Sequence, residues 1–473
     1  MAVSVYRGAR NIQIRPDREG RIAMTLLEQI KEAGIVGCGG AGFPTHVKLN
    51  CTVEYLIINA AECEPLLRTD RWLMIHKAAE IITAVEAIGA MTGAGRQYIA
   101  LKETYHEEIT ALESAIANAN SSITLYKMRN FYPAGDEQVM VCDVTGRTVP
   151  PSGIPLDVGC VVSNLATVYA VYQASQGQPL TGKYLTVTGA VASPCIVHAP
   201  VGTSFLQCLE AAGGSLSGDC YIIAGGPMMG RCYSMEEALD LTVTKTTSGF
   251  ILVSSSTPLV QNHKIPVSVS LKRAKMSCIQ CSYCTQMCPR YLTGHPLKPH
   301  MIMRKLAYAP SPEEVLDDEY IKQAMICSEC GLCETYACPM GLQPRQVNIY
   351  IKGLLRQNNF RYQKPSEPCR PLEERSYRKA PSKRMAIRLG VDEYYDCHID
   401  QCITISPSTV RILLHQHIGA PSVPVVCPGE QVREGQLIAA IPEQSLGANI
   451  HASITGTVTE VSPHQITISA DSQ

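Results

Sequence analysis

The sequence predicts a multidomain α/β protein that carries, in addition, a helical cysteine-rich part and an all-β part. Three observations support this fold class. Strand-like and helix-like segments alternate over the first 175 residues, eight cysteines fall into two regularly spaced runs, and apolar and polar residues alternate beyond residue 406. A chain of 473 residues is also longer than one hydrophobic core usually supports, so we expect several domains.

The composition is that of an ordinary globular protein and excludes several classes of function. Charged residues make up 18% and apolar residues 45% of the chain, and the net charge is −1. No basic excess points to nucleic acid, and one Trp and five Phe offer few platforms for stacking bases. No segment approaches the ~20 apolar residues of a membrane span, and residues 1–20 lack the apolar core of a signal peptide. We therefore expect a soluble protein of a reducing compartment that binds no nucleic acid and has no membrane span.

Residues 1–175 are expected to form a Rossmann-like α/β domain. The pattern of apolar residues predicts strands at 55–59, 98–102 and 123–128, and helices at 23–34, 71–91 and 104–119. Because strands and helices alternate, the strands should form a parallel sheet with helices on its faces.

The remaining chain changes character several times. Residues 176–260 contain two strand-like runs and a helical segment, which predicts a small β-grasp domain. The cysteine runs lie in a helical module at 265–360, residues 361–405 have the polar, proline-containing composition of a linker, and residues 406–473 predict an all-β domain.

The two cysteine runs predict two [4Fe–4S] clusters in one ferredoxin-like module. In such runs, three thiolates spaced two residues apart hold one cluster, and the fourth cysteine, followed by proline, crosses to the other cluster. The second run has one extra residue before its fourth cysteine. Paired zinc sites and a disulfide cluster are the alternatives, but zinc ribbons use paired C-x2-C knuckles and disulfides are rare in cytosolic chains. The expected quartets are Cys278, Cys281, Cys284 and Cys338, and Cys327, Cys330, Cys333 and Cys288.

A glycine-rich loop, Gly37-Cys38-Gly39-Gly40-Ala41-Gly42, formally satisfies the dinucleotide motif G-x-G-x-x-G. That motif requires a strand before it, whereas a helix is expected here, and Phe43-Pro44 follows directly. Four glycines in six residues nevertheless favour close approach of backbone N–H groups to an anion such as a phosphate.

Longer motifs around this loop carry a family resemblance. GCGGAGFPTHVKL (37–49) and NAAECEP (59–65) resemble the flavin loop of the NADH-binding subunit of respiratory complex I and, more closely, the C subunit of the Rnf complex. NFYPAGDE (130–137), GGPMMG (225–230), both cysteine runs and the tail segment LGANIHASI resemble the cobalamin reductases of propanediol-utilising bacterial microcompartments. The order of the domains also matches that family, whose β-grasp domain is of the SLBB type and whose tail is a barrel-sandwich hybrid.

This resemblance implies FMN as a cofactor, NADH as a substrate and specific residues that contact them. Glycines of the loop and Lys48 would bind the FMN phosphate, Asn59 and Glu62 would hold the ring and ribityl chain, and Asn164 would close the phosphate side. Glu64 and Glu137 would contact NADH. Two residues depart from the pattern of the complex I subunit: Ala61 stands where that subunit has an aspartate, and Ser163 stands where it has an asparagine. The implied set is Gly37, Gly39, Gly40, Gly42, Lys48, Asn59, Glu62, Glu64, Tyr132, Gly135, Asp136, Glu137 and Asn164.

The resemblance implies an NADH-dependent reductase that passes electrons through FMN and two [4Fe–4S] clusters to cobalamin, in the bacterial cytoplasm and within or attached to a microcompartment. An Fe–S-bearing shell protein is an implied partner. Two alternatives stay open: an NADH oxidoreductase that recycles NAD with a ferredoxin, flavoprotein or shell-protein acceptor and no corrin, and a non-catalytic electron-transfer docking subunit.

Two features of the last eighty residues resemble functional sites that we do not assign. The tail from 411 to 473 contains no lysine, so it cannot carry biotin or lipoate through an amide. Asp396-Cys397-His398-Ile399-Asp400-Gln401 approaches the D-x-H-x-x-G motif of corrin-binding proteins, but Gln401 replaces the glycine. We interpret this similarity as coincidence.

Overall fold

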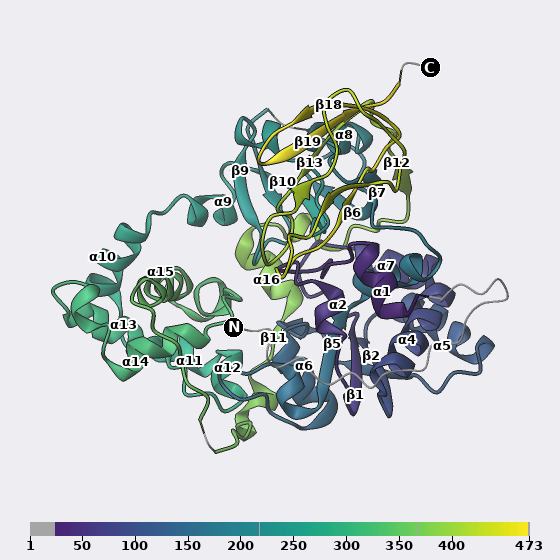
Figure 1. The fold of residues 1–473 in the computed structure, drawn as a ribbon. Coiled ribbons are helices and arrows are strands. Elements are labelled where there is room, and N and C mark those ends of the chain that lie inside the picture. The colour runs from purple at the N-terminus through teal and green to yellow at the C-terminus, as the bar shows by residue number, and fades with distance from the viewer. Residues whose placement is uncertain (1–23, 217, 366, 472–473) are drawn as a thin grey trace.

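The computed structural model describes residues 24–216, 218–365 and 367–471, so the expectation for residues 1–20 lies outside the described residues. The chain folds into four units that pack together (Figure 1). An N-terminal α/β unit lies at the lower right of the view, with a β-grasp unit above it, the helical cysteine module at the lower left, and the C-terminal β domain at the top. The predicted multidomain fold class is confirmed.

The N-terminal unit is built on a four-stranded parallel sheet in the order β3-β2-β1-β5. Its strands are β1 (Tyr55–Asn59), β2 (Arg96–Lys102), β3 (Thr124–Met128) and β5 (Cys160–Asn164). Its helices are α1 (Leu26–Glu32), α2 (Thr45–Lys48), α3 (Thr69–His76), α4 (Ala78–Thr92), α5 (His106–Asn118), α6 (Glu137–Thr145) and α7 (Leu165–Ser175). The single helix expected at 71–91 is two helices, because the backbone of Lys77 leaves the helical region with a φ of −131°.

The strand order places a topological switch point between β1 and β5. The chain continues from β1 to β2 on one side, whereas β5 lies on the other side of β1. Asn59 and Asn164 end these two strands and are direct register partners. Ligands of open α/β sheets bind outside the carboxyl ends of the strands at such a point, so the fold brings two predicted site residues to the expected position.

The β-grasp unit contains a six-stranded sheet in the order β12-β7-β6-β10-β8-β9. Phe205 and Phe250 are fully buried in its core and meet edge to face, with ring centroids 5.0 Å apart. Strand β12 comes from far along the chain, within the stretch whose composition predicts a linker. The elements are β6 (Gly182–Gly189), β7 (Cys195–Pro200), α8 (Phe205–Ala211), β8 (Cys220–Ala224), β9 (Arg231–Ser234), β10 (Gly249–Ser254) and β12 (Cys402–Thr404).

The cysteine module is helical. Its helices are α9 (Pro258–His263), α10 (Val267–Ser277), α11 (Tyr283–Gln286), α12 (Pro289–Leu292), α13 (Pro299–Tyr308), α14 (Glu319–Lys322) and α15 (Pro344–Gln357). The extra residue of the second cysteine run lies in a π-helical turn at Cys333–Ala337, immediately before Cys338. A π-turn accommodates one more residue than an α-turn, which explains how the longer spacing is absorbed.

The C-terminal domain consists of two antiparallel sheets, β13-β19-β18-β15 and β14-β16-β17. Before it, β11 (Ala380–Pro381) pairs with β4 (Phe131–Tyr132) of the N-terminal unit, and α16 (Ser382–Leu389) follows. The strands of the domain are β13 (Thr409–Leu413), β14 (Val423–Pro424), β15 (Gln431–Val432), β16 (Leu437–Ala440), β17 (Ile450–His451), β18 (Gly456–Val461) and β19 (Gln465–Ser469).

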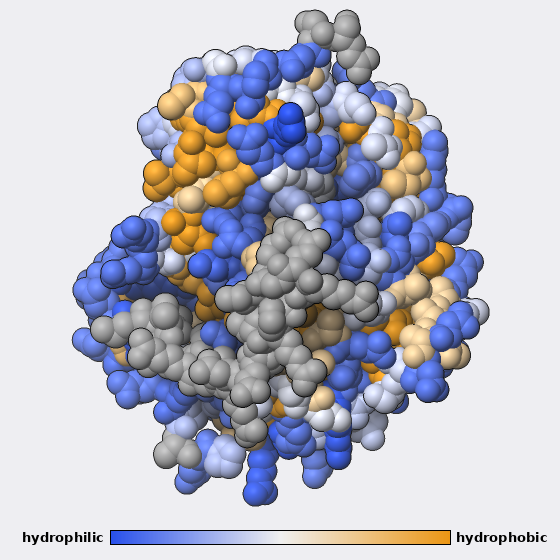
Figure 2. Space-filling view, turned by 45° about the vertical axis from the view of Figure 1, so that its right-hand side comes forward, coloured by the Kyte–Doolittle hydropathy of each residue, from blue (hydrophilic) through white to orange (hydrophobic). Residues whose placement is uncertain are grey.

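Buried polar contacts hold the units together. The amino group of Lys245, in the β-grasp unit, donates to the carbonyl of Gly34 at 2.8 Å and to that of Asn449 at 2.6 Å. The face of the molecule seen in Figure 2 is largely hydrophilic, with its most extensive hydrophobic area at the upper left of the view. Among the described residues, no helix has both the length and the apolar character needed to cross a membrane.

Candidate functional site

A cavity of about 290 Å³ lies at the carboxyl ends of β1 and β5, where three units meet. The N-terminal unit supplies most of its wall, the β-grasp unit adds Lys183, Tyr184, Met229 and Ser248, and the cysteine module adds Ser328 and Cys330. Eight of the thirteen residues predicted to contact cofactor or substrate line it: Gly39, Asn59, Glu62, Glu64, Tyr132, Gly135, Asp136 and Asn164.

The other five predicted residues do not line this cavity. Lys48 and Glu137 form an ion pair with each other at 2.5 Å. Gly37 donates its N–H to the carbonyl of Phe43 at 3.0 Å, and Gly42, with a φ of +74°, packs against Thr246 and Gln416. At Gly40, a β-carbon would have no described atom within 4 Å. The glycine loop therefore serves both the cavity and the packing of the units.

Gly39 and Asn164 form one corner of the cavity. A β-carbon on Gly39 would lie 2.7 Å from the Asn164 side chain, so only glycine permits this approach. Asn164 is the N-cap of α7 and accepts a hydrogen bond from the N–H of Thr167. The corner thus combines a glycine loop with the amino end of an eleven-residue helix, and both features favour an anion.

Asn59 connects the strand end to the segment that contains Gly135. Its side-chain amide donates to the Gly135 carbonyl at 2.8 Å, and its side-chain oxygen accepts from the N–H of Ala61 at 3.2 Å. Both halves of the amide are engaged, so the side chain has a fixed orientation at the floor of the cavity.

Glu62 follows β1 in a turn where its own backbone φ is +33°. Its carboxylate caps α3, accepting hydrogen bonds from the N–H groups of Asp70 at 3.0 Å and Arg71 at 3.2 Å. Burial nevertheless raises the pKa of Glu62, because the N–H groups only partly replace water.

Glu64 is held by the GGPMMG loop of the β-grasp unit. One carboxylate oxygen accepts from the N–H of Met228 at 2.8 Å, and a β-carbon on Gly226 would lie 2.2 Å from the side chain. The other oxygen is buried and has no hydrogen-bond partner among the described residues. Burial raises the pKa of Glu64 to about 7. A buried carboxylate oxygen without a partner, on the wall of a cavity, is suited to a ligand that donates hydrogen bonds.

Asp70 and Lys183 line the cavity as well, and motif-based reasoning did not identify either. Asp70 accepts from the Asn164 amide at 2.8 Å, and burial together with the neighbouring Glu62 raises its pKa to about 7. Its position in the first turn of a helix after NAAECEP is the signal that could have indicated it. Lys183 is the second residue of strand β6 in the β-grasp unit, and nothing in its local sequence points to the cavity.

The cavity and the cysteine module share a wall. The Tyr132 hydroxyl donates to the backbone carbonyl of Cys330 at 2.6 Å. Asp136 pairs with Arg290 of the module at 2.6 Å, and both side chains are only 10% exposed. Asp136 also caps α6 through the N–H groups of Gln138 and Val139.

The neighbours that raise the pKa of each thiol show which cysteines lie close together. Burial, followed by the nearby Cys338, Cys278 and Cys281, raises the pKa of Cys284 to about 12. In the other set, burial is the main cause that raises the pKa of Cys288, and Cys330 and Cys327 add to it. Each fourth cysteine therefore lies beside the other run, as expected for a two-cluster module.

Zinc sites and disulfide bonds are the two alternatives for the cysteines of the two runs. No disulfide bond joins any two cysteines of the described chain. Within the described ranges, no three Cys, His, Asp or Glu side chains are grouped closely enough to hold a single metal ion. Zinc holds its ligands within about 2.3 Å of one point, whereas a [4Fe–4S] cluster spreads its ligands over four iron atoms, which is the arrangement that the two cysteine runs predict.

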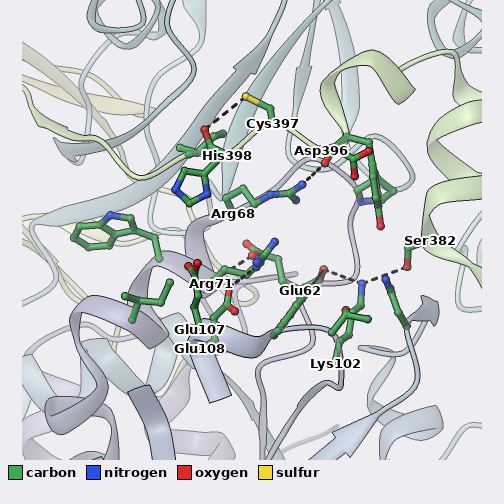
Figure 3. A pocket seen from close by; sticks show the side chains of 18 of the residues that line it. Glu62, Arg68, Arg71, Lys102, Glu107, Glu108, Ser382, Asp396, Cys397 and His398 are labelled. Atoms are coloured by element: carbon green, nitrogen blue, oxygen red, sulfur yellow. Dashed lines mark hydrogen bonds and ion pairs between the residues drawn. The ribbon is translucent and has the colours of Figure 1, made fainter. Parts of the chain in front are cut away.

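A second pocket, of about 360 Å³, adjoins the cavity and shares Glu62 and Glu64 with it (Figure 3). Arg68, Arg71 and Lys102 line it, facing the segment around His398. Arg71 pairs with the buried Glu108 at 2.5 Å, and Lys102 donates to Ser382 at 3.3 Å. The segment from Tyr395 to Asp400 therefore forms the wall of a pocket, although its composition predicts a linker.

Comparison with known protein families identifies four domains along the chain. The Nuo51 FMN-binding domain matches residues 30–173, the SLBB domain 184–231, the 4Fe-4S dicluster domain 277–343, and the RnfC barrel sandwich hybrid domain 396–473. An FMN-binding domain and a dicluster domain are thus both present, on the cavity and on the cysteine module described above.

Curated relatives cover nearly the whole chain. Cobalamin reductase PduS of Citrobacter freundii is 41% identical over 448 residues, which is 94% of this chain and 96% of that protein. Its counterpart in Salmonella typhimurium (strain LT2) is 42% identical with the same coverage. The C subunit of the Na(+)-translocating ferredoxin:NAD(+) oxidoreductase complex of Acetobacterium woodii is 31% identical over 276 residues, 57% of this chain and 59% of that one. The chain belongs to the PduS family of cobalamin reductases.

Proposed function

We propose that this protein is an NADH-dependent reductase that delivers electrons through FMN and two [4Fe–4S] clusters to the cobalt of cobalamin. The observation that carries the proposal is the shared wall between the cavity and the cysteine module, where Cys330 lines the cavity and Tyr132 bonds to its carbonyl. When bound, FMN would take a hydride from NADH and release electrons singly, and the clusters would relay them.

The residues of the cavity have distinct roles in this proposal. Asn59 and Glu62 are fixed by their hydrogen bonds and position the ring system of FMN. Gly39 and Asn164 form the corner that receives its phosphate. Tyr132 and Cys330 close the side that faces the cysteine module, which excludes water from the path between flavin and cluster.

The adjoining pocket is our candidate for the NADH site. It shares Glu62 and Glu64 with the cavity, so a nicotinamide bound there would reach the flavin. Glu64 offers its unpartnered oxygen to a ribose hydroxyl or a carboxamide. Arg68 supplies a cation for a pyrophosphate, whereas Arg71 is already paired with the buried Glu108. Lys48 and Glu137 neutralise each other, so either could contact a nucleotide only after their ion pair opens.

The quartet of Cys278, Cys281, Cys284 and Cys338 is our candidate for the exit of electrons. Ile279 and Tyr283, which lie within its run, are 60% and 50% exposed. An exposed apolar rim around the outer cluster would allow the flat face of a corrin to approach it. The same rim would serve an Fe–S-bearing shell protein of a microcompartment, which the family resemblance implies as a partner.

Anaerobic stopped-flow spectroscopy tests the proposed reaction. The reconstituted protein is mixed with NADH and then with hydroxocobalamin. We expect bleaching of the flavin absorbance, followed by NADH-dependent appearance of cob(II)alamin. Bleaching without corrin reduction would contradict cobalamin as the acceptor, and no bleaching with intact clusters would contradict NADH oxidation itself.

A further inference from the structure

Lys183 is a buried lysine on the wall of the proposed flavin cavity. It is the second residue of β6, in the β-grasp unit, and only 5% of its surface is exposed. Its amino group has no ion-pair or hydrogen-bond partner in residues 24–216, 218–365 and 367–471. A buried cation is costly unless it is paired. A buried lysine that forms no direct ion pair and lies beside a cavity is suited to an anionic ligand.

The neighbours of Lys183 define where this anion would lie. Asp70 is close enough for Lys183 to lower its pKa, although burial and Glu62 outweigh that effect and raise the pKa of Asp70 to about 7. Asp70 in turn accepts from the Asn164 amide, and Asn164 contacts Gly39. Lys183 thus faces the corner formed by the glycine loop and the amino end of α7.

This corner has the three components of a phosphate site. Glycines allow close approach of backbone N–H groups, a helix amino end favours negative charge, and a buried amine adds a full positive charge. Elsewhere the wall carries the carboxyl groups of Glu62, Glu64 and Asp136, and Lys183 is the one lysine or arginine among the described residues that line it. Asp70 is the acidic group within the corner, and its raised pKa lets it accept a proton when a phosphate arrives.

We propose that Lys183, contributed by the β-grasp unit, binds the phosphate of FMN and makes the site select FMN over riboflavin. This inference rests on the proposed flavin function, since it assigns a residue to the same cavity. It gives the β-grasp unit a direct part in cofactor binding, in addition to its packing role. The FMN-binding domain matched by family comparison ends at residue 173 and does not include Lys183.

Binding of FMN and riboflavin to flavin-free protein, followed by quenching of flavin fluorescence, tests the inference. We expect Lys183→Met to weaken FMN binding about 10- to 100-fold while riboflavin binding changes by less than about twofold. Lys183→Arg should retain most of the preference for FMN. Lys127→Met is the matched control, because that lysine is on the surface and pairs with Glu113 at 3.0 Å.

Phosphorus-31 NMR of bound FMN gives a second, independent readout. In the wild type, the phosphate resonance should stay that of the dianion across neutral pH, and in Lys183→Met it should titrate. Unchanged FMN binding by Lys183→Met, or equal losses of FMN and riboflavin, would overturn the inference. Iron content and circular dichroism exclude misfolding of the variant. Failure of NADH to bleach flavin in the wild type would instead overturn the proposed function, and the preference for FMN would still be measurable.

Discussion

The hydroxyl group of Tyr132 donates a 2.6 Å hydrogen bond to the backbone carbonyl of Cys330, a residue 198 positions further along the chain. This bond joins the proposed flavin cavity to the cysteine module, and both residues line the cavity. The cysteine quartet that contains Cys330 is therefore the one adjacent to the cavity, and the quartet that contains Cys278 is the outer one.

Tyr132→Phe should remove this bond and leave the ring in place. The loss of one buried hydrogen bond is expected to lower the free energy of unfolding by about 1 kcal/mol, because the Cys330 carbonyl loses its donor. Anaerobic thermal unfolding measures the effect. Iron analysis should still give about eight atoms per chain, and an unchanged unfolding midpoint would show that the bond contributes nothing.

Cys288 and Cys338, the two cysteines that precede proline, are each assigned to the cluster of the other run. Replacing one or the other should therefore damage different clusters. Cys288→Ser should damage the cluster next to the cavity, so that NADH still reduces the flavin but electrons do not reach the other cluster. Cys338→Ser should damage the outer cluster and leave flavin-to-cluster transfer intact. Iron content, falling from about eight to about four atoms in each variant, and electron paramagnetic resonance of the NADH-reduced protein check this. Identical spectra from the two variants would contradict the assignment.

Arg290 and Asp136 form a buried ion pair between two units, 2.6 Å apart. Arg290→Gln alone should lower the free energy of unfolding by about 3–5 kcal/mol, because it leaves a buried carboxylate without its partner. Adding Asp136→Asn should recover part of this loss, since asparagine is neutral and still caps α6. A denaturation cycle of the wild type, both single variants and the double variant measures the coupling. Additive effects would mean that the pair does not couple the units.

Asp70 should make the stability of the flavin-free protein depend on pH. Burial and the neighbouring Glu62 raise its pKa from 3.8 to about 7. Between these two pH values, Asp70 is protonated in the native state and ionised in the unfolded state. Stability is therefore expected to fall as pH rises from about 4 to about 7, and to lose nothing further from this group above that range.

Asp70→Asn should reduce this slope and raise stability at pH 8 by on the order of 1 kcal/mol. Glu64, whose pKa is also raised to about 7, contributes a slope of the same sign, so part of the dependence should remain. Unfolding midpoints measured at several pH values test the prediction. The same slope in Asp70→Asn and the wild type would rule Asp70 out as its source.

Local sequence was sufficient for features that depend on spacing and periodicity. The strand expected at 55–59 is β1 (Tyr55–Asn59), because a run of four apolar residues before Asn59 suits a strand that is buried on both faces of a parallel sheet. The cysteine spacing likewise predicts two thiol quartets, since thiolates two residues apart can bind one shared cluster, and the assignment of the quartets stays a prediction. Glu62 and Glu64 follow that strand and line the cavity, a position that the end of a parallel strand makes predictable, whereas their contacts with a ligand stay a prediction.

Only the tertiary structure decided which side chains meet. Lys48 was expected at a phosphate, but it pairs with Glu137, 89 residues away, and the cation that lines the cavity is Lys183 of another unit. Glu64 is fixed by a loop 164 residues further along. Hydrophobic periodicity specifies which residues face a core, but it carries no information about which polar groups from distant segments become neighbours. Those contacts arise when the units pack and each buried charge must find a partner, and that packing is a property of the folded molecule as a whole.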